Sequence, residues 1–232
     1  MKVLLLLAHP KPRPFNGALR DRARAVLLAA GYEVQESDLH AMQWQQVLGA
    51  DCLATSEAPF NAQAAQKHAV VANSQTGDIA AEQAKLGWAD LLIVIFPVWW
   101  FGVPAILKGW IDRIFALDVA YGCGRWFDLR VYRGKRVLTA CTTGAKSDRF
   151  RDGGLFGPID WVLHPLRVGT FNFCSFDTLE PFVAGAAGHR DEASRHALLD
   201  ERAQRMAGIG HESPQPFRHL ADFPSPALRD HR

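Results

Sequence analysis

The sequence predicts an α/β fold in which helices cover both faces of a doubly wound, five-stranded parallel sheet. Two observations carry this prediction. Short apolar segments of strand length alternate with longer segments whose apolar residues recur at helical spacing. Residues 91–96 (LLIVIF) are continuously apolar, which is typical of a strand buried on both faces of a parallel sheet. Such alternation gives right-handed crossovers, and 2-1-3-4-5 is the natural order for the five strands.

The 232-residue chain has the length of one α/β domain. We assign residues 1–209 to this domain and residues 210–232, which lack periodicity, to an extended C-terminal tail available to a partner subunit. The formal net charge of +2, with acids and bases interspersed, argues against nucleic-acid binding, and no apolar run has the length of a membrane span. Four cysteines without CxxC spacing favour free thiols in a cytoplasmic protein.

The predicted strands occupy residues 2–8, 32–37, 91–96 and 135–142 and part of residues 170–182. The first (KVLLLLA) is apolar throughout and is expected at the centre of the sheet. The second (YEVQES) alternates polar and apolar residues, which favours a position near an edge. Prolines follow the first strand and stand at Pro97 after the third, and proline ends a strand because it has no N–H to donate.

The predicted helices occupy residues 15–30, 78–88, 104–115, 159–167 and 191–206. Asn16 is a suitable N-cap for the first helix, and Gly31 ends it. Pro104 suits the first turn of the third helix, whose apolar residues recur at three- and four-residue spacing. The connecting segments are an Ala- and Gln-rich excursion with helical pieces (51–76), a loop or small hairpin (119–133) and a glycine-rich loop (149–157).

The chain is organised around residues 89–115, which read as strand, aromatic loop and helix. Ligands of open α/β sheets bind at the carboxyl ends of the strands, where this loop must lie. Three large rings at residues 99–101 (WWF), held between prolines and Gly102, would form a wall for a flat conjugated ligand. The same rings would also suit an ordinary core, and the residues alone leave both interpretations open.

The loop after the first strand, residues 8–16 (AHPKPRPFN), lies where an α/β fold binds anions, because helix N–H groups and the helix dipole meet there. The sequence lacks both GxGxxG and GxxxxGKS/T, so a dinucleotide fingerprint and a P-loop are disfavoured. It also lacks the GxSxG of a serine hydrolase. From the residues alone, a proline-stiffened turn before a capped helix is the simpler interpretation.

The segment FPVWWFGVPAILKGWIDRIF resembles the signature of the flavodoxin-like NAD(P)H:quinone oxidoreductases, and the resemblance extends over residues 2–206. It implies a flavodoxin-like fold, a homodimer and bound FAD, with FMN less favoured. It also implies a ping-pong route in which the flavin takes a hydride from NADH or NADPH and passes it to a quinone. The residues that it implies for flavin binding are His9, Phe15, Asn16, Gly17, Ala18, Asn61, Pro97, Val98, Trp99, Trp100, Phe101, Thr142, Thr143, Gly144, Ala145 and Arg195.

The resemblance also implies a substrate wall made of Tyr121, Cys123 and Phe173. Cys123 stands where the family has a second tyrosine. Phe173 resembles a phenylalanine that one subunit lends to the other's pocket, which is why a homodimer is implied. The resemblance predicts no metal, because the histidine positions of the family's metal-binding branch read Val168 and Asn172 here.

Mammalian members of the family use a tyrosine and a histidine to support charge on the reduced flavin. An ungapped count places Phe150 and Phe156 at these two catalytic positions, so that Tyr121 is the remaining catalytic candidate with a proton. Arg149 or Arg151 could stabilise an anionic reduced flavin instead. Two alternatives stay open: an FMN-dependent azo- or nitroreductase, and a flavin-binding regulatory subunit of an ion-efflux system with little turnover.

Overall fold

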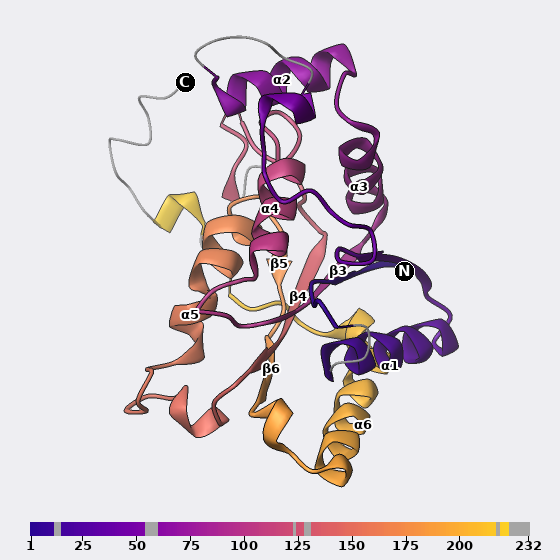
Figure 1. Ribbon diagram of the computed structural model, residues 1–232, viewed down its shortest axis with the longest axis vertical. Helices are drawn as coiled ribbons and strands as arrows, with labels where there is room; N and C mark the ends of the chain where they lie inside the picture. The colour runs from indigo at the N-terminus through magenta and orange to yellow at the C-terminus, as the bar shows by residue number, and fades with distance from the viewer. Residues whose placement is uncertain (12–14, 54–59, 123, 128–130, 217–218, 223–232) are drawn as a thin grey trace.

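The computed structural model of the protein describes residues 1–11, 15–53, 60–122, 124–127, 131–216 and 219–222. At its centre lies a parallel sheet in the order β2-β1-β3-β4-β5, with β6 also pairing with β4 (Figure 1). The predicted strand order and fold class are therefore confirmed. The strands are β1 (Lys2–Leu7), β2 (Glu33–Asp38), β3 (Leu91–Pro97), β4 (Arg136–Thr143), β5 (Asp177–Thr178) and β6 (Phe182–Gly185).

Strand β3 is buried along its whole length, as its continuous apolar sequence predicts. Its side chains alternate between two cores, because successive residues of a strand point to opposite faces of the sheet. Leu92, Val94 and Phe96 belong to one core. Ile93 and Ile95 belong to the other. The sheet is thus buried on both faces, and its ligand-binding edge is the edge at which the strands end.

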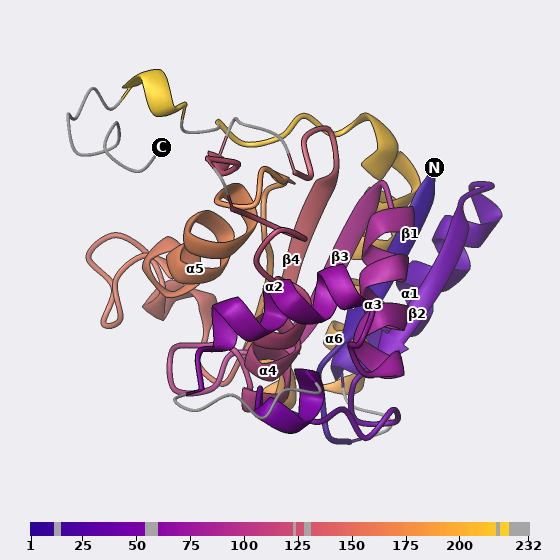
Figure 2. The same ribbon diagram turned by 90° about the horizontal axis from the view of Figure 1, so that it is seen from above.

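The helices divide between the two faces of the sheet. Helices α1 (Phe15–Ala29) and α6 (Glu192–Gly208) lie side by side on one face, where their apolar residues share a core (Figures 1 and 2). The other core contains residues of α2 (Ala62–Ala72), α3 (Gly77–Trp88), α4 (Ala105–Ile114) and α5 (Ile159–Leu166). None of the helices in the described ranges combines the length and apolar character needed to cross a membrane.

The fifth position of the sheet differs from the prediction of one strand. Two short strands, β5 and β6, pair in turn with β4, and the register between them contains one extra residue: Val137 faces Thr178, whereas Ala140 faces Phe182. Pro181 lies between the two strands and cannot donate a ladder hydrogen bond. An extra residue opposite a continuous strand is the pattern of a β-bulge. The proline and the bulge together explain why the strand is divided.

The first part of the predicted tail packs against its own sheet. One guanidinium nitrogen of Arg136, Nη1, donates hydrogen bonds to the carbonyl oxygens of Ile209 (3.1 Å) and Gly210 (2.9 Å). The N–H of Gln215 donates to the Thr178 carbonyl at 2.8 Å. Arg136 begins β4, so this segment lies at the amino end of the sheet. Contact between the tail and a partner subunit stays a prediction, and residues 217–218 and 223–232 lie outside the described ranges.

Candidate active site

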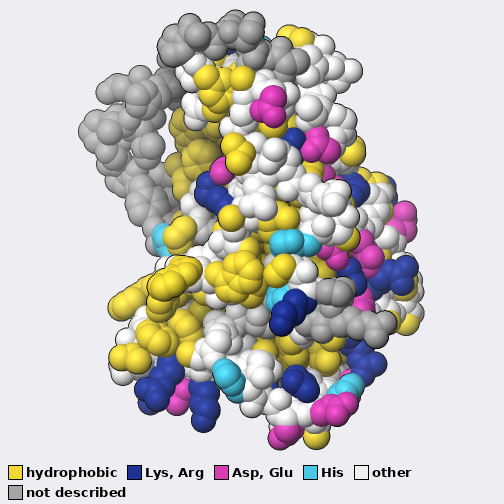
Figure 3. Space-filling view, in the orientation of Figure 1, with side chains coloured by type: hydrophobic (Ala, Val, Ile, Leu, Met, Phe, Trp, Pro, Cys, Tyr) yellow, Lys and Arg dark blue, Asp and Glu magenta, His cyan; other side chains and the backbone are white. Residues whose placement is uncertain are grey.

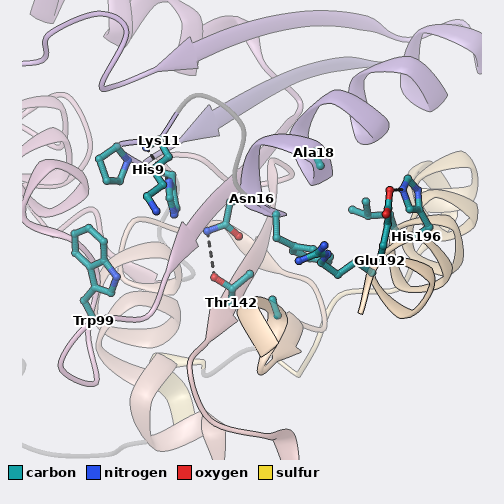
Figure 4. Close-up of a pocket in the computed structure, with 14 residues that line it drawn as sticks. His9, Lys11, Asn16, Ala18, Trp99, Thr142, Glu192 and His196 are labelled. Atoms are coloured by element: carbon teal, nitrogen blue, oxygen red, sulfur yellow. Dashed lines mark hydrogen bonds and ion pairs between the residues drawn. The ribbon is translucent and has the colours of Figure 1, made fainter. Parts of the chain in front are cut away.

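A cavity of about 670 Å³ lies where β1, β3 and β4 end, between these strands and helices α1 and α6 (Figure 4). It brings together seven of the residues predicted to bind a flavin: His9, Phe15, Asn16, Ala18, Trp99, Thr142 and Arg195. Sequence reasoning missed seven further lining residues: Pro10, Lys11, Ala187, Gly188, Glu192, His196 and Leu199. Arg195, implied by the resemblance, ends the segment GHRDEASR (188–195), which also contains Gly188 and Glu192, so this segment was the available signal for this end of the cavity.

His9 follows β1 and occupies one end of the cavity, with Lys11 and Trp99 nearby (Figure 4). Its Nδ1 accepts a hydrogen bond from the Lys11 backbone N–H at 3.1 Å. Burial is the main cause that lowers the pKa of His9; the backbone contact with Lys11 partly offsets it, and the nearby charges of His40 and Lys11 act with burial. A neutral His9 whose Nδ1 accepts a hydrogen bond carries its proton on Nε2. His9 can therefore donate Nε2–H to a ligand oxygen.

Asn16 presents a buried acceptor to the middle of the cavity. Its prediction as a helix N-cap is wrong, because α1 already begins at Phe15 and Asn16 lies within the first turn. Only 2% of Asn16 is exposed, and its Nδ2 donates to Thr142 Oγ1 at 3.2 Å across the cavity floor (Figure 4). Its Oδ1 is buried and has no hydrogen-bond partner among the described residues. An unpaired buried acceptor is costly, so this position favours a ligand that brings a hydroxyl or N–H group.

The aromatic loop after β3 is a tight turn. The backbone N–H groups of Trp99 and Gly102 each donate to the other residue's carbonyl at 3.0 Å. Between them, Trp100 and Phe101 adopt φ values of 50° and 56°. Two left-handed residues in succession define a type I′ turn, which normally contains Asn and Gly, so bulky aromatics here are under backbone strain. Strain of this kind clusters at ligand-binding sites. Of the three rings, Trp99 lines the cavity.

The two predicted catalytic positions pack against this turn. The ring of Phe101 lies 5.3 Å from that of Phe156 and 6.3 Å from that of Phe150, and the latter two rings are 5.2 Å apart. The two residues that the ungapped count selected therefore lie beside the aromatic loop, and their assignment to the catalytic positions stays a prediction. Neither ring can exchange a proton. Arg149 and Arg151, the predicted substitutes, are both exposed.

The segment after β4 is held by the connection between β6 and α6. The hydroxyl of Thr143 donates to the Ala145 carbonyl at 2.8 Å. The N–H of Ala186 donates to the carbonyl oxygens of both Thr143 and Ala145, at 2.9 Å each. Gly144 is exposed between them. The predicted Thr-Thr-Gly turn is thus fixed at the edge of the cavity, although only Thr142 lines it.

Helix α6 closes the far end of the cavity. Its N-cap is Asp191, whose carboxylate accepts the Ser194 N–H at 2.7 Å. In its first two turns lie Arg195, which lines the cavity, and Glu192, whose carboxylate is 3.8 Å from the imidazole of His196 (Figure 4). The helix therefore presents mixed charges beside the positive end of its dipole, an arrangement that suits the polar part of a nucleotide.

The predicted substrate wall lies elsewhere. Tyr121 and Phe173, with ring centres 5.7 Å apart, line a second cavity of about 610 Å³, and no described residue lines both this cavity and the first. Cys123 lies outside the described residues. Asn61, predicted to contact the flavin, caps α2: its Oδ1 accepts the Ala64 N–H at 3.0 Å. Within one chain, the predicted flavin site and the predicted substrate wall are therefore separate.

Comparison with known proteins decides the family. The sequence profile of the flavodoxin-like fold matches residues 1–207. The ribosyldihydronicotinamide dehydrogenase (quinone) of Homo sapiens is 36% identical over 218 residues, which cover 93% of this chain and 94% of that protein. The chain belongs to the flavodoxin-like family of quinone oxidoreductases.

Two further proteins are similar to this flavodoxin-like protein over most of its length. The NAD(P)H dehydrogenase (quinone) 1 of Rattus norvegicus is 33% identical over 223 residues, covering 93% of this chain and 80% of that protein. The crystal structure of a Klebsiella pneumoniae protein assigned as a quinone reductase superposes with a TM-score of 0.94 at 37% identity, over 98% of this chain and 93% of that one. The family predicted from the aromatic segment is confirmed.

The residues that line the cavity at the ends of β1, β3 and β4 fit a flavin nucleotide. The unpaired Oδ1 of Asn16 would accept from a hydroxyl of the sugar-like chain of a flavin, and His9 Nε2–H would donate to a phosphate oxygen. Trp99, which also lines the cavity, offers a flat apolar surface for the ring. In the described part of the chain, no three His, Cys, Asp or Glu side chains are placed to hold a metal ion.

Proposed function

We propose that the protein is an FAD-dependent NAD(P)H:quinone oxidoreductase that works by a ping-pong route. The observation that carries the proposal is the single cavity that joins the first loop, the aromatic loop, the end of β4 and helix α6. These four segments are far apart in the sequence, and each was predicted to contact the flavin. The names of the relatives support oxidoreductase activity toward quinones.

FAD fits this cavity better than FMN does. A mononucleotide would occupy the region between Trp99 and His9, whereas the cavity continues to Arg195 and His196 on α6 (Figure 4). The adenylate half of a dinucleotide would use that end, with its phosphate charge near the α6 N-terminus and the Arg195 guanidinium. FMN binding stays the alternative, together with azo- or nitroreductase activity.

The bound flavin would supply the hydride chemistry, accepting two electrons from the donor and returning them to the quinone. The chain's own residues position it and exclude water. Trp99 and the strained turn give the ring a rigid wall, Asn16 and Thr142 fix the adjoining polar chain, and His9 and Arg195 hold the phosphates. Rigid placement of the reacting ring is the main contribution that a protein makes to hydride transfer.

The separate position of the substrate wall supports a homodimer. Tyr121 and Phe173 line a different cavity from the flavin residues of the same chain, so a second copy would have to bring them over the flavin. The protein also exposes large apolar side chains, among them Trp100 (99% exposed), Trp161 (72%) and Leu155 (71%). Hydrophobic side chains gather over and beside α5 (Figure 3). Exposed apolar patches are typical of protein interfaces.

Anaerobic absorption spectroscopy tests the function. The purified protein, loaded with FAD, is mixed with NADH, NADPH or ribosyldihydronicotinamide and then with a quinone. We expect the flavin band to bleach with at least one donor and to return when the quinone is added. The relatives' names justify all three donors. A protein that binds no flavin contradicts the proposal.

The regulatory alternative rests on one observation, the two phenylalanines at the predicted acid–base positions. Phe150 and Phe156 pack on Phe101 and offer no proton. If the protein is a flavin-binding regulatory subunit, the flavin band stays oxidised after each donor is added. Rapid, saturable, quinone-dependent oxidation of a donor would exclude this alternative.

A further inference from the structure

We propose that Gln63 is a positioning residue that orients the Tyr121 hydroxyl toward the quinone. This inference rests on the proposed function. The Nε2 of Gln63 donates a hydrogen bond to the Tyr121 hydroxyl oxygen at 3.3 Å. Both residues line the cavity of about 610 Å³ that also contains Phe173.

The direction of this hydrogen bond decides what the hydroxyl can do. Because the Tyr121 oxygen accepts from Gln63, its own proton is left for another acceptor. Within the described part of the chain, that hydroxyl has no other hydrogen-bond partner. Burial raises the pKa of Tyr121, and the hydrogen bond from Gln63 partly offsets this effect. The phenol therefore stays protonated at neutral pH and is available as a donor.

Gln63 is placed by contacts that do not depend on it. Asn61 caps α2 two residues earlier. Further along the same helix, Gln66 Nε2 donates to the Asp112 carbonyl at 2.8 Å, and the Lys67 ammonium lies 3.1 Å from the Asp118 carboxylate. These contacts hold α2 against α4 and against the loop that carries Tyr121. Gln63 itself is exposed, so replacing it should leave the helix in place.

A hydrogen-bond donor at this wall would act in the half-reaction in which the flavin reduces the quinone. Reducing a quinone to a hydroquinone requires one hydride and one proton, and negative charge develops on the carbonyl oxygen as the hydride arrives. A hydrogen bond from Tyr121 would stabilise that charge. The proton that completes the hydroquinone comes from water, so Tyr121 keeps its own. Phe150 and Phe156 cannot provide such a bond, so we assign this role to the Gln63–Tyr121 pair, which lines the same cavity as Phe173.

Kinetics of the two half-reactions test the role in the FAD-loaded protein. In Gln63→Met, we expect reduction by the nicotinamide donor to be unchanged and reoxidation by the quinone to slow by about tenfold, less than for loss of a direct oxyanion donor. Gln63→Glu should slow reoxidation further, because its carboxylate would accept the phenol proton. Tyr121→Phe should slow it at least as much as Gln63→Met, and the double variant no more than Tyr121→Phe alone.

The matched control is Lys67→Met, which breaks a different side-chain contact between α2 and the same loop, the ion pair with Asp118. Its half-reactions should match those of the unmodified protein. If Lys67→Met slows reoxidation as much as Gln63→Met does, the effect is structural and the inference is wrong. An unchanged reoxidation rate in Gln63→Met, in an enzyme that otherwise turns over, would overturn this inference and leave the proposed function intact.

A spectroscopic readout examines the contact without turnover. The chain contains three tyrosines, so fluorotyrosine labelling gives three ¹⁹F signals, and Tyr121→Phe identifies one of them. Loss of the Gln63 donor should raise the pKa of Tyr121, because a hydrogen bond to the phenol oxygen favours the phenolate. A pKa that is the same in Gln63→Met would refute the contact. A flavin that no donor reduces would refute the proposed function, and this titration would still decide the contact.

Discussion

At the scale of single residues, the cavity depends on side chains whose polar atoms are only partly used by the protein. Asn16 donates through Nδ2 to Thr142, and no described residue pairs with its Oδ1. His9 accepts from Lys11 at Nδ1, which leaves its Nε2 to contact a ligand. The residue types were readable from the sequence, but these unpaired atoms were not. They depend on β1 and β4 lying on either side of β3, which no local pattern specifies.

If His9 holds a flavin phosphate as proposed, flavin binding should depend on pH. Burial lowers its pKa in the free protein, whereas a bound phosphate would stabilise its charged form and raise the pKa. Binding then takes up a proton, so FAD affinity should rise as the pH falls from the higher to the lower of these pKa values. Fluorescence titrations over about pH 5 to 8 measure this slope. His9→Asn should remove most of it, and a flat profile in the unmodified protein would contradict this role.

At the scale of elements, periodicity and proline placed the main strands and helices, because those signals are local. The division of the fifth strand escaped prediction, since the bulge is defined only against β4. The sequence also did not predict the strained turn. Three aromatics before a glycine indicated a loop, but nothing indicated that Trp100 and Phe101 would adopt left-handed backbone conformations. At this turn, a substitution that relieves backbone strain should stabilise the fold and lower the activity.

Replacing Trp100 by Asn should stabilise the protein and impair it. Trp100 is 99% exposed, so little burial is lost, and Asn tolerates its left-handed conformation better. We expect the free energy of unfolding to rise by about 1 kcal/mol. Quinone turnover should fall, because the exposed indole is part of the apolar surface beside the flavin site. Urea unfolding measures the first effect, and Leu155→Asn, exposed but unstrained, is the control that should show no gain. A destabilised Trp100→Asn would show that the indole contributes more than strain.

At the scale of the whole molecule, one chain carries the predicted flavin site and the predicted substrate wall in two separate cavities. The sequence implied a second copy through Phe173, but only the structure separates the predicted flavin residues from Tyr121 and Phe173, into cavities that share none of the described lining residues. Each active site would therefore contain the flavin half of one subunit and the substrate wall of the other. This division makes a prediction that no single-chain site would satisfy.

Two inactive variants should restore activity when they are mixed. Arg195→Ala weakens flavin binding and Phe173→Ala opens the substrate wall, so each homodimer is impaired. After unfolding and refolding together, half of the dimers are mixed and one of their two sites is intact, which returns about a quarter of full activity. Separately refolded samples, combined afterwards, are the control. No recovery from the co-refolded mixture would place each complete site within one chain.

The cavity and the segment after α6 lie at opposite ends of the sheet. The cavity opens where the strands end, whereas the segment that Arg136 and Thr178 hold runs past the end where β4 begins. Ser213 is an exposed residue of that segment, and the three cysteines of the described chain are buried. A thiol introduced as Ser213→Cys could fasten the protein to a gold electrode with its cavity facing the solution, where donors and quinones would reach it directly.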